Sequence, residues 1–255
     1  MQLEWDHKMN ENQKGVLTGC DENHEWMLKW WWTHYSQSNH FPVTFLDFGM
    51  STSARLWCKR IGTVVPVSMD ESAFYSREKL PTKTRKKWDA CYAKTIWKSR
   101  KPWCLKPLGL LKTPYEYSAW IDLDCKVLKT IDPLIKACEG DVDIAIAREN
   151  SRGVSHYKKS NGIIPGEVVY NAGVLSFQKH SPCILKWAKN MVSRNRDFLG
   201  DTEVLNRTVF EENFKVKKLS SSFNQSFVDG EKKDTHILHF VCSGGKHEIF
   251  RSLYS

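Results

Sequence analysis

The feature that most restricts the fold of this chain is a repeated alternation of short apolar runs with longer helical patterns. The β-branched and aromatic runs at 15–21, 40–49 and 61–67 are predicted strands. Between the first two, 25–37 is predicted to form a helix with apolar residues on most of its faces. Such alternation predicts an α/β fold with a mostly parallel central sheet flanked by helices, in which ligands bind beyond the carboxyl ends of the strands.

The same alternation continues through the second half of the chain. One face of the segment 84–100 is apolar and the other carries Lys and Arg, which predicts a helix. Its apolar positions are Trp88, Cys91, Tyr92 and Ile96. Two more helices are predicted to begin at Ser181-Pro182, with the serine as N-cap, and near Asp201. The polar, Gly-rich segment 149–167 is predicted to be a surface loop or a lid. Further strands are predicted at 118–124, 142–149, 167–177 and 236–242, the last before a Gly-Gly turn.

Size and composition are those of a folded protein with an anionic partner. The chain has 255 residues, of which 41% are hydrophobic and 11 are Trp, so it can bury a substantial core. The first 14 residues are polar and are predicted to form a tail, and 15–255 is predicted to be one domain. A formal net charge of +9 favours nucleotides, nucleic acid, acidic glycans or a membrane surface, without choosing among them.

Cysteine usage and hydropathy predict the compartment. The 8 Cys show no zinc-ligand spacing and several lie in apolar runs, so free thiols in a reducing compartment are expected. The N-terminus has no apolar core of a signal peptide, and no apolar stretch reaches the roughly 18 to 20 residues of a membrane span. A soluble, cytoplasmic protein is therefore expected, and peripheral contact with a membrane stays open.

The stretch YSAWIDLDCKVLKTID, at 117–132, closes an apolar strand with two acidic residues. In extended backbone Asp122 and Asp124 would point to the same face, roughly 6.5 to 7 Å apart. A divalent cation would remove the repulsion between them by taking oxygen ligands from both, with Leu123 anchored in the core. The alternative is an Asx turn or a helix cap in which both carboxylates face water.

YEYSAWIDLDCKVL resembles the metal-binding DxD strand of GT-A glycosyltransferases, which use nucleotide sugars. The resemblance is strongest to the group that includes glycogenin and the bacterial lipopolysaccharide galactosyltransferases. Three more stretches are similar to segments of that group. YNAGVLSF (170–177) is similar to its donor-sugar segment, and GDTEVLN (200–206) to its helix start near the reacting carbon. HILHFVCSGGKHEIF (236–250) is similar to its closing segment. The resemblance covers about 15–250. It implies a GT-A fold with a nucleotide-binding half at about 15–150 and a donor-sugar and acceptor half at about 151–255.

The closing segment supplies the rest of the implied metal and diphosphate site. By resemblance His239 is a third metal ligand beside the two carboxylates, and neutral imidazole suits Mn²⁺, with Mg²⁺ as the second choice. Gly244, Gly245 and Lys246 would meet the diphosphate through backbone N–H groups and an ammonium. The alternatives are a core histidine with a backbone partner and an ordinary Gly-Gly turn. The interval from His239 to Lys246 is one residue longer than in the relatives, so which glycine meets the phosphate stays open.

The resemblance places Asp201 and Glu203 near the anomeric carbon of the donor sugar. A carboxylate there would act as general base on the acceptor hydroxyl, or would stabilise an oxocarbenium-like state. The alternative is structural, because Asp is a good N-cap and Glu in a first turn complements the helix dipole. Relatives have Asp-Gln where this chain has Asp201-Thr202, and the sequence does not decide between inversion and retention.

Four other residues are candidates for the donor site. Asn171 would bond sugar hydroxyls, or alternatively turn the chain locally. Thr18 and Asp21, at the end of the first strand, resemble the loop that recognises uracil and ribose. Lys106 lies 16 residues before Asp122, near where relatives carry a basic residue that reaches the donor. Among 38 basic residues, chance placement of that lysine is the alternative.

Together these patterns predict a metal-dependent glycosyltransferase that moves a sugar from a nucleotide-diphosphate donor, foremost a UDP-sugar, to a glycan or other hydroxyl acceptor. The other classes considered are a basic nucleic-acid-binding protein, a metal-dependent phosphotransferase or nuclease, and a relative that binds the donor without catalysis. Nucleic acid is not an expected partner, because no nucleic-acid-binding motif is present and paired acids repel phosphate in the absence of a metal.

Overall fold

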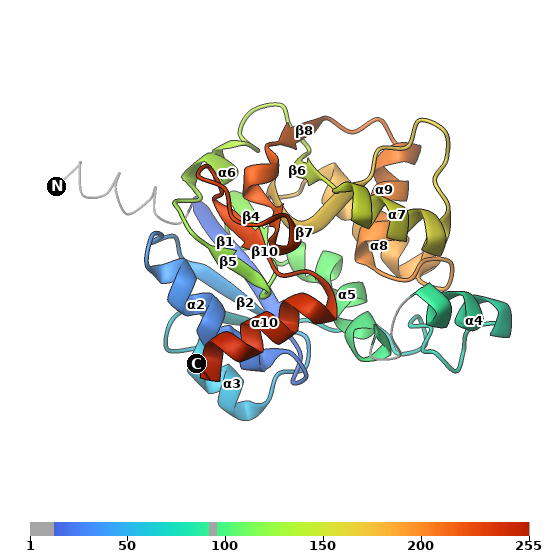
Figure 1. The fold of residues 1–255 in the computed structure, drawn as a ribbon, viewed down its shortest axis with the longest axis horizontal. Coiled ribbons are helices and arrows are strands. Elements are labelled where there is room, and N and C mark those ends of the chain that lie inside the picture. Colours follow the sequence, from blue (N-terminus) through green and yellow to red (C-terminus); the bar gives the residue numbers. More distant parts are fainter. Residues whose placement is uncertain (1–12, 92–95, 255) are drawn as a thin grey trace.

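The computed structural model describes residues 13–91 and 96–254, which fold around a central sheet with helices on both faces (Figure 1). The strands of this sheet are β1 (Lys14–Cys20), β2 (Val43–Asp47), β3 (Thr63–Pro66), β4 (Tyr117–Ile121), β6 (Ile144–Arg148), β7 (Tyr170–Gln178) and β8 (Val216–Leu219). They lie in the order β3-β2-β1-β4-β7-β6-β8. β7 runs antiparallel to β4 and β6, and the other neighbouring pairs are parallel. The prediction of a mostly parallel α/β sheet is confirmed.

A smaller sheet connects the middle of the chain to its C-terminal part. It has the order β5-β10-β9 and consists of β5 (Cys125–Val127), β10 (Ile237–His239) and β9 (Gln225–Ser226). β10 pairs antiparallel with β5 and places His239 opposite Cys125. Because β5 begins directly after Asp124, this pairing brings His239 beside the acidic pair of the sequence.

The helices are α2 (Leu28–Ser36), α3 (Thr52–Cys58), α4 (Thr82–Cys91), α5 (Ile96–Leu110), α6 (Asp132–Lys136), α7 (Ser151–Asn161), α8 (Pro182–Arg194), α9 (Asp201–Glu211) and α10 (Cys242–Tyr254). Short 3₁₀ turns are η1 (Glu25–Met27), η2 (Ser221–Phe223) and η3 (Phe227–Asp229). None of the described helices combines the length and the apolar character that crossing a membrane requires.

Both faces of the sheet are buried. The neighbouring residues Val16 and Leu17 of β1 are each fully buried, but they belong to different apolar clusters. The cluster of Val16 includes residues of α2, α3, α6 and α10, whereas that of Leu17 includes residues of α5, α8 and α9. Successive side chains of a strand point to opposite faces, so a strand buried on both sides reads as a continuous apolar run. This is why the strands were recognisable in the sequence.

The predicted loop or lid at 149–167 is wrong over most of its length, because α7 occupies it. The side chain of Asn150 caps this helix by accepting a hydrogen bond from the backbone N–H of Gly153 at 2.9 Å. Gly162, with a φ of +79°, ends it. Tyr157 is buried and donates to Glu167 at 2.6 Å, which ties the helix to the segment that follows.

The predicted C-terminal strand and Gly-Gly turn also need correction. β10 ends at His239, and Gly244 and Gly245 lie in the first turn of α10 rather than in a turn of their own. Gly245 lies against the backbone carbonyl of Phe240, where a Cβ would overlap it. The glycine therefore serves close packing of the helix start onto the end of β10.

Two predicted boundaries differ as well. The single helix predicted over 84–100 is replaced by α4 and α5, and α5 continues past Pro102 and Pro107. Tyr92, part of that predicted apolar face, lies outside the described residues, as does nearly all of the predicted tail at 1–14. The strand predicted over 118–124 ends at Ile121, before the two acidic residues.

Candidate active site

The two acidic residues lie in a tight turn between β4 and β5. The backbone N–H of Cys125 donates to the carbonyl of Asp122 at 3.1 Å, and Leu123 is buried in the core. The expectation of extended backbone at this pair is wrong, although Leu123 anchors the pair as expected. The alternative prediction had two parts, a turn and carboxylates that face water. The turn is present, but Asp124 is buried rather than facing water.

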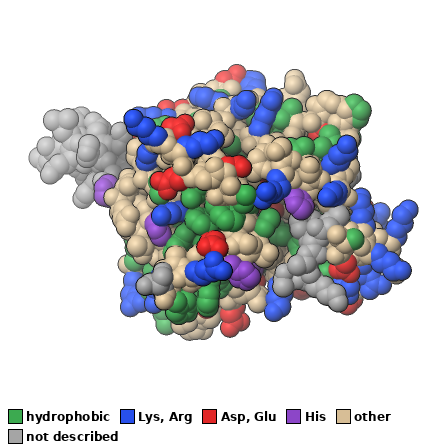
Figure 2. Space-filling view, in the orientation of Figure 1, with side chains coloured by type: hydrophobic (Ala, Val, Ile, Leu, Met, Phe, Trp, Pro, Cys, Tyr) green, Lys and Arg blue, Asp and Glu red, His purple; other side chains and the backbone are tan. Residues whose placement is uncertain are grey.

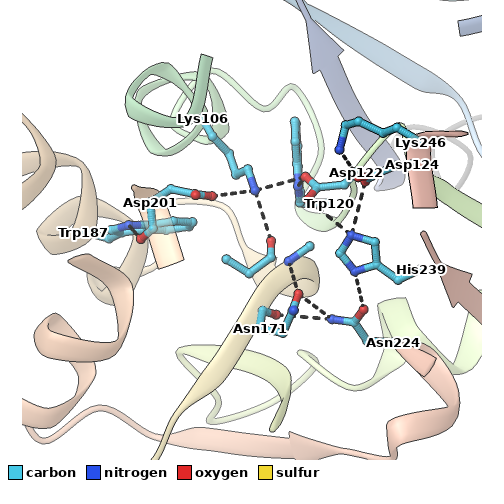
Figure 3. Close-up of polar contacts among 12 residues, drawn as sticks. Lys106, Trp120, Asp122, Asp124, Asn171, Trp187, Asp201, Asn224, His239 and Lys246 are labelled. Atoms are coloured by element: carbon cyan, nitrogen blue, oxygen red, sulfur yellow. Dashed lines mark hydrogen bonds and ion pairs between the residues drawn. The ribbon is translucent and has the colours of Figure 1, made fainter. Parts of the chain in front are cut away.

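Asp124 lies between two cationic groups. One of its oxygens is 2.7 Å from Nζ of Lys246, and the other is 3.2 Å from Nε2 of His239. Burial opposes ionisation, but Lys246 and His239 outweigh it and hold the pKa of Asp124 well below its usual range. Asp124 in turn raises the pKa of His239, against the effect of burial. These contacts come from β10 and α10 and are drawn in Figure 3.

Asp122 faces a different cation. Its Oδ1 accepts a hydrogen bond from the indole Nε1 of Trp120 at 2.7 Å and is 3.0 Å from Nζ of Lys106. Burial raises the pKa of Asp122, and the ammonium of Lys106 opposes this effect. The other oxygen of Asp122 is 4.0 Å from Nε2 of His239. The imidazole thus faces both carboxylates of the turn.

Lys106 joins the acidic pair to Asp201. Its Nζ is 2.6 Å from Oδ2 of Asp201, and the lysine side chain is only 6% exposed. Burial favours the neutral amine, but Asp122 and Asp201 raise the pKa of Lys106 above its usual value. A charged lysine therefore lies between the two carboxylates, as Figure 3 shows.

At the start of α9 the two predicted catalytic acids, Asp201 and Glu203, have different partners. Gly200 is the N-cap, and the carboxylate of Glu203 accepts its backbone N–H at 3.0 Å, which forms the return half of a capping box. Asp201 is the first helical residue and directs its carboxylate to Lys106 instead of capping the helix. The indole of Trp187 donates to the backbone carbonyl of Asp201 at 3.0 Å and fixes this helix start.

Asn171, at the start of β7, is held by a network on the other side of His239. Its Oδ1 accepts from the backbone N–H of Gly173 at 2.9 Å and from Nδ2 of Asn224 at 3.0 Å. Its own Nδ2 donates to Glu149 at 2.6 Å. Asn224 and Glu149 were not predicted, and no pattern in the sequence distinguishes them from ordinary polar residues.

The predicted base-binding residues differ in accessibility. Asp21 follows β1 and accepts hydrogen bonds from Nδ1 of His24 at 2.6 Å and from Asn23 at 2.9 Å. Burial raises the pKa of Asp21, but the hydrogen bonds from His24 and Asn23 outweigh burial and lower this pKa below its usual value. Thr18 lies inside β1 and is fully buried, and its hydroxyl has no hydrogen-bond partner within the described part of the chain. Nε2 of His24 also approaches the hydroxyl of Ser99 on α5, at 3.1 Å.

A cleft next to these groups is lined by residues from distant parts of the chain. The end of β1 and the loop after it line one side, and α5 contributes Ser99, Pro102, Trp103 and Lys106. The turn residues Asp122 and Asp124, with Lys246, line its floor. The cleft lies at the carboxyl ends of β1 and β4, the location expected for a ligand of a parallel sheet.

The donor atoms around the turn fit a hard divalent cation. Asp122, Asp124 and His239 supply carboxylate oxygens and one imidazole nitrogen, a set that suits Mn²⁺ or Mg²⁺. The thiol of Cys125 also lies within 4.8 Å of ligand atoms of Asp124 and His239. Burial and the neighbouring carboxylates raise the pKa of Cys125 well above its usual value. A thiol is also a softer ligand than Mn²⁺ or Mg²⁺ prefers.

Comparisons with known proteins identify the fold. No family model and no curated protein matches the sequence. The galactosyltransferase LgtC, solved with donor and acceptor sugar analogues, matches with a TM-score of 0.57 and 16% identity, over 94% of this chain and 96% of that one. Mouse xyloside xylosyltransferase 1 matches with a TM-score of 0.53 and 14% identity, over 91% of this chain and 98% of that one. GlyE of Streptococcus pneumoniae has a TM-score of 0.51 and 13% identity, over 91% of this chain and 55% of that one. The chain has the GT-A fold of these glycosyltransferases, as its motifs predicted.

Proposed function

We propose that this chain is a glycosyltransferase that moves a sugar from a nucleotide-diphosphate donor, foremost a UDP-sugar, to a hydroxyl of a glycan or another acceptor. One observation carries the proposal. At the carboxyl edge of a sheet with the glycosyltransferase fold, Asp122, Asp124 and Lys246 line a cleft, and the buried imidazole of His239 faces both carboxylates.

The charges of this site match the needs of the reaction, in which a nucleoside diphosphate departs. Asp122, Asp124 and His239 would hold Mn²⁺ or Mg²⁺, which when bound supplies positive charge to the diphosphate leaving group. Lys246 would turn from Asp124 to the phosphates and add a second positive charge. Gly244 has no neighbouring atoms within 4 Å of its Cβ position, so the backbone at the start of α10 is open to a phosphate.

For the reacting carbon, the contacts favour Asp201 over Glu203 as the catalytic acid. Glu203 is engaged with the backbone of Gly200, whereas Asp201 extends from the helix start toward Lys106. A carboxylate that extends from a helix start suits the stabilisation of an oxocarbenium-like state, and the role of general base is the second assignment. Asn171 would bond the donor-sugar hydroxyls, and Asp21 the base and ribose. Thr18 is fully buried inside β1, so the sequence assignment of Thr18 to the base-binding loop is not carried into this proposal.

The other functions considered receive less support. Lys and Arg side chains are spread over the face shown in Figure 2, with one group at the end formed by α4, where Lys83, Lys86 and Lys87 are exposed. A solvated helix face accounts for it without a nucleic-acid partner. A two-metal nuclease or phosphotransferase would need further free carboxylates, and Asp201, the next one, is held by Lys106. The described cysteines with free thiols are compatible with a reducing cytoplasmic setting.

A thermal-shift experiment with UDP and Mn²⁺ tests the donor class. At a UDP concentration about 100 times its Kd, binding adds about 2.7 kcal/mol to the free energy of unfolding, a rise in Tm of about 5 to 10 °C. Each of the two alone should give a smaller rise. Release of UDP or GDP from a panel of nucleotide sugars then identifies the donor, and anomeric NMR of the product gives the stereochemistry. A shift with DNA but none with UDP and Mn²⁺ would refute the proposal.

A further inference from the structure

His239 presents a question that its role as a ligand does not answer. An imidazole has two nitrogens, and only the one facing the carboxylates can share a cation with them. In this structure Nε2 is the nitrogen that faces Asp124, at 3.2 Å, and Asp122, at 4.0 Å. Nδ1 points the other way, toward Oδ1 of Asn224 at 2.8 Å (Figure 3).

The direction of that hydrogen bond is fixed by groups that cannot exchange donor and acceptor roles. The backbone N–H of Gly173 can only donate, so the atom of Asn171 that it meets at 2.9 Å must be the amide oxygen. The amide nitrogen of Asn171 then faces the carboxylate of Glu149 at 2.6 Å, which accepts it. The amide orientation of Asn171 is therefore determined from both ends.

The orientation of Asn224 follows from that of Asn171. Its Nδ2 donates to Oδ1 of Asn171 at 3.0 Å and lies 3.4 Å from the backbone carbonyl of the same residue. Because both of these atoms are acceptors, the amide oxygen of Asn224 must face the imidazole. Nδ1 of His239 then has to carry a proton. When the imidazole is neutral, as a metal ligand must be, the lone pair is therefore on Nε2, the nitrogen that faces the carboxylates.

The position of the ring is also fixed by packing. A Cβ at Gly173 would overlap Cε1 of His239, so the imidazole lies directly on the backbone of β7. His239 is only 4% exposed, and the strand pairing of β10 with β9 and β5 holds its backbone on both sides. The remaining freedom is rotation of the ring, and the hydrogen bond to Asn224 opposes it.

We propose that Asn224 is a positioning residue that aims Nε2 of His239 at Asp122 and Asp124, with its own amide oriented by Asn171. The proposal rests on the proposed function for the identity of the cation. It assigns a role to a residue outside the sequence motifs, and it links the cation site to the residue proposed to bond the donor sugar. Outer partners of metal-binding histidines commonly alter metal affinity by about 10- to 100-fold when removed.

The test compares variants of Asn224 by the affinity of the protein for Mn²⁺, measured from the EPR signal of free Mn²⁺ in the presence of UDP. Asn224→Leu keeps the shape and removes the acceptor, and should weaken Mn²⁺ binding at least about tenfold. Asn224→Asp keeps an acceptor for Nδ1–H but loses the donor to Asn171, and should lose less Mn²⁺ affinity than Asn224→Leu. The matched control is Asn190→Leu, whose buried amide donates to Thr208 on α9 at 2.9 Å, and it should leave Mn²⁺ affinity unchanged.

Two results would overturn the proposal. One is Mn²⁺ affinity in Asn224→Leu equal to that of the wild type; the other is an Asn224→Asp protein as weak as Asn224→Leu. If the leucine variant does not fold, a tenfold or greater loss in Asn224→Asp overturns it as well.

Crystal structures of the metal-free wild type and of Asn224→Leu test the positioning role of Asn224 without a cation, because they show the orientation of the His239 ring directly. The ring of His239 should keep its orientation in the wild type and rotate or take several orientations in the variant. An unchanged ring in the variant refutes positioning by Asn224. A wild type that binds no Mn²⁺ with UDP would instead end the metal part of the proposed function, and the ring orientation would still decide this proposal.

Discussion

Replacing Lys106 by Met should destabilise the fold more than any other change of a single lysine discussed here. The ammonium lies 3.0 Å from Asp122 and 2.6 Å from Asp201, and the side chains of Lys106 and Asp201 are 6% and 7% exposed. At such burial, removing one partner leaves an uncompensated charge, which costs about 3 to 5 kcal/mol. For a domain of this size that loss lowers Tm by about 6 to 20 °C.

The pH dependence of this variant should identify the cause. In the wild type the raised pKa keeps Lys106 charged, so its contribution persists below the ordinary lysine pKa of about 10.4 and is lost only at higher pH. Without it, burial is no longer opposed at Asp122, and the pKa of Asp122 rises further above its unfolded value of about 3.9. The folded variant then binds a proton that the unfolded chain does not. Its deficit in unfolding free energy should therefore shrink as the pH falls from about 8 toward 5.

Urea denaturation of both proteins across this pH range measures the deficit. The matched control is Lys101→Met on the same helix, whose pair with Glu71 is formed by side chains 44% and 73% exposed. That surface pair should contribute no more than about 1 kcal/mol. A Lys106→Met protein no less stable than Lys101→Met, or one whose deficit is constant with pH, would refute the view of Lys106 as a buried counter-ion.

Three further predictions follow from other parts of the structure. Asp124→Ala should abolish the Mn²⁺-dependent rise in Tm with UDP while the protein stays folded by circular dichroism, and retained binding would return the acidic pair to a structural turn. Arg100→Met should lower the free energy of unfolding by about 3 to 5 kcal/mol in urea, because the buried guanidinium binds backbone carbonyls of Leu199, Tyr75 and Asn195. Burial raises the pKa of the Cys138 thiol to about 11. Because the unfolded thiol ionises at about 8.5, the free energy of unfolding should fall as the pH rises from about 8.5 to about 11. Cys138→Ala should make this fall smaller.

The strands, and the place of the acidic pair at the end of a strand, could be predicted from the sequence because they depend on local patterns, whereas the turn that holds the pair differs from the extended backbone that was expected. β1 and β4 are short apolar runs whose two faces are both buried, and the acids stand out where the second run stops. The order of the strands could not be predicted in the same way. β7 inserts antiparallel between β4 and β6, and this pairing depends on contacts between segments distant in the chain.

The errors concentrate where glycine is used for packing. Gly153, Gly244 and Gly245 weaken the helical pattern of their segments, because glycine has low helix propensity. In the folded protein Gly245 allows α10 to begin against the carbonyl of Phe240, and the buried Tyr157 holds α7 in place. Tertiary packing overrides the local preference in both helices, and no single-sequence pattern contains that information.

The roles of the two lysines also had to come from the structure. Both were candidates from the sequence, Lys246 because it follows two glycines in the closing segment and Lys106 because of its distance from Asp122, but neither pattern shows what the ammonium contacts. Lys106 is 6% exposed and is bound by two carboxylates, so moving it would deprive both of their nearest cation. Lys246 is 30% exposed, meets one carboxylate and lies at the start of a helix beside the cleft. A buried ammonium with two partners is a permanent counter-ion, whereas an accessible one with a single partner can exchange that partner for a phosphate at small cost. The site therefore has a fixed ammonium, that of Lys106, and a movable one, that of Lys246. Binding of a diphosphate requires only Lys246 to move.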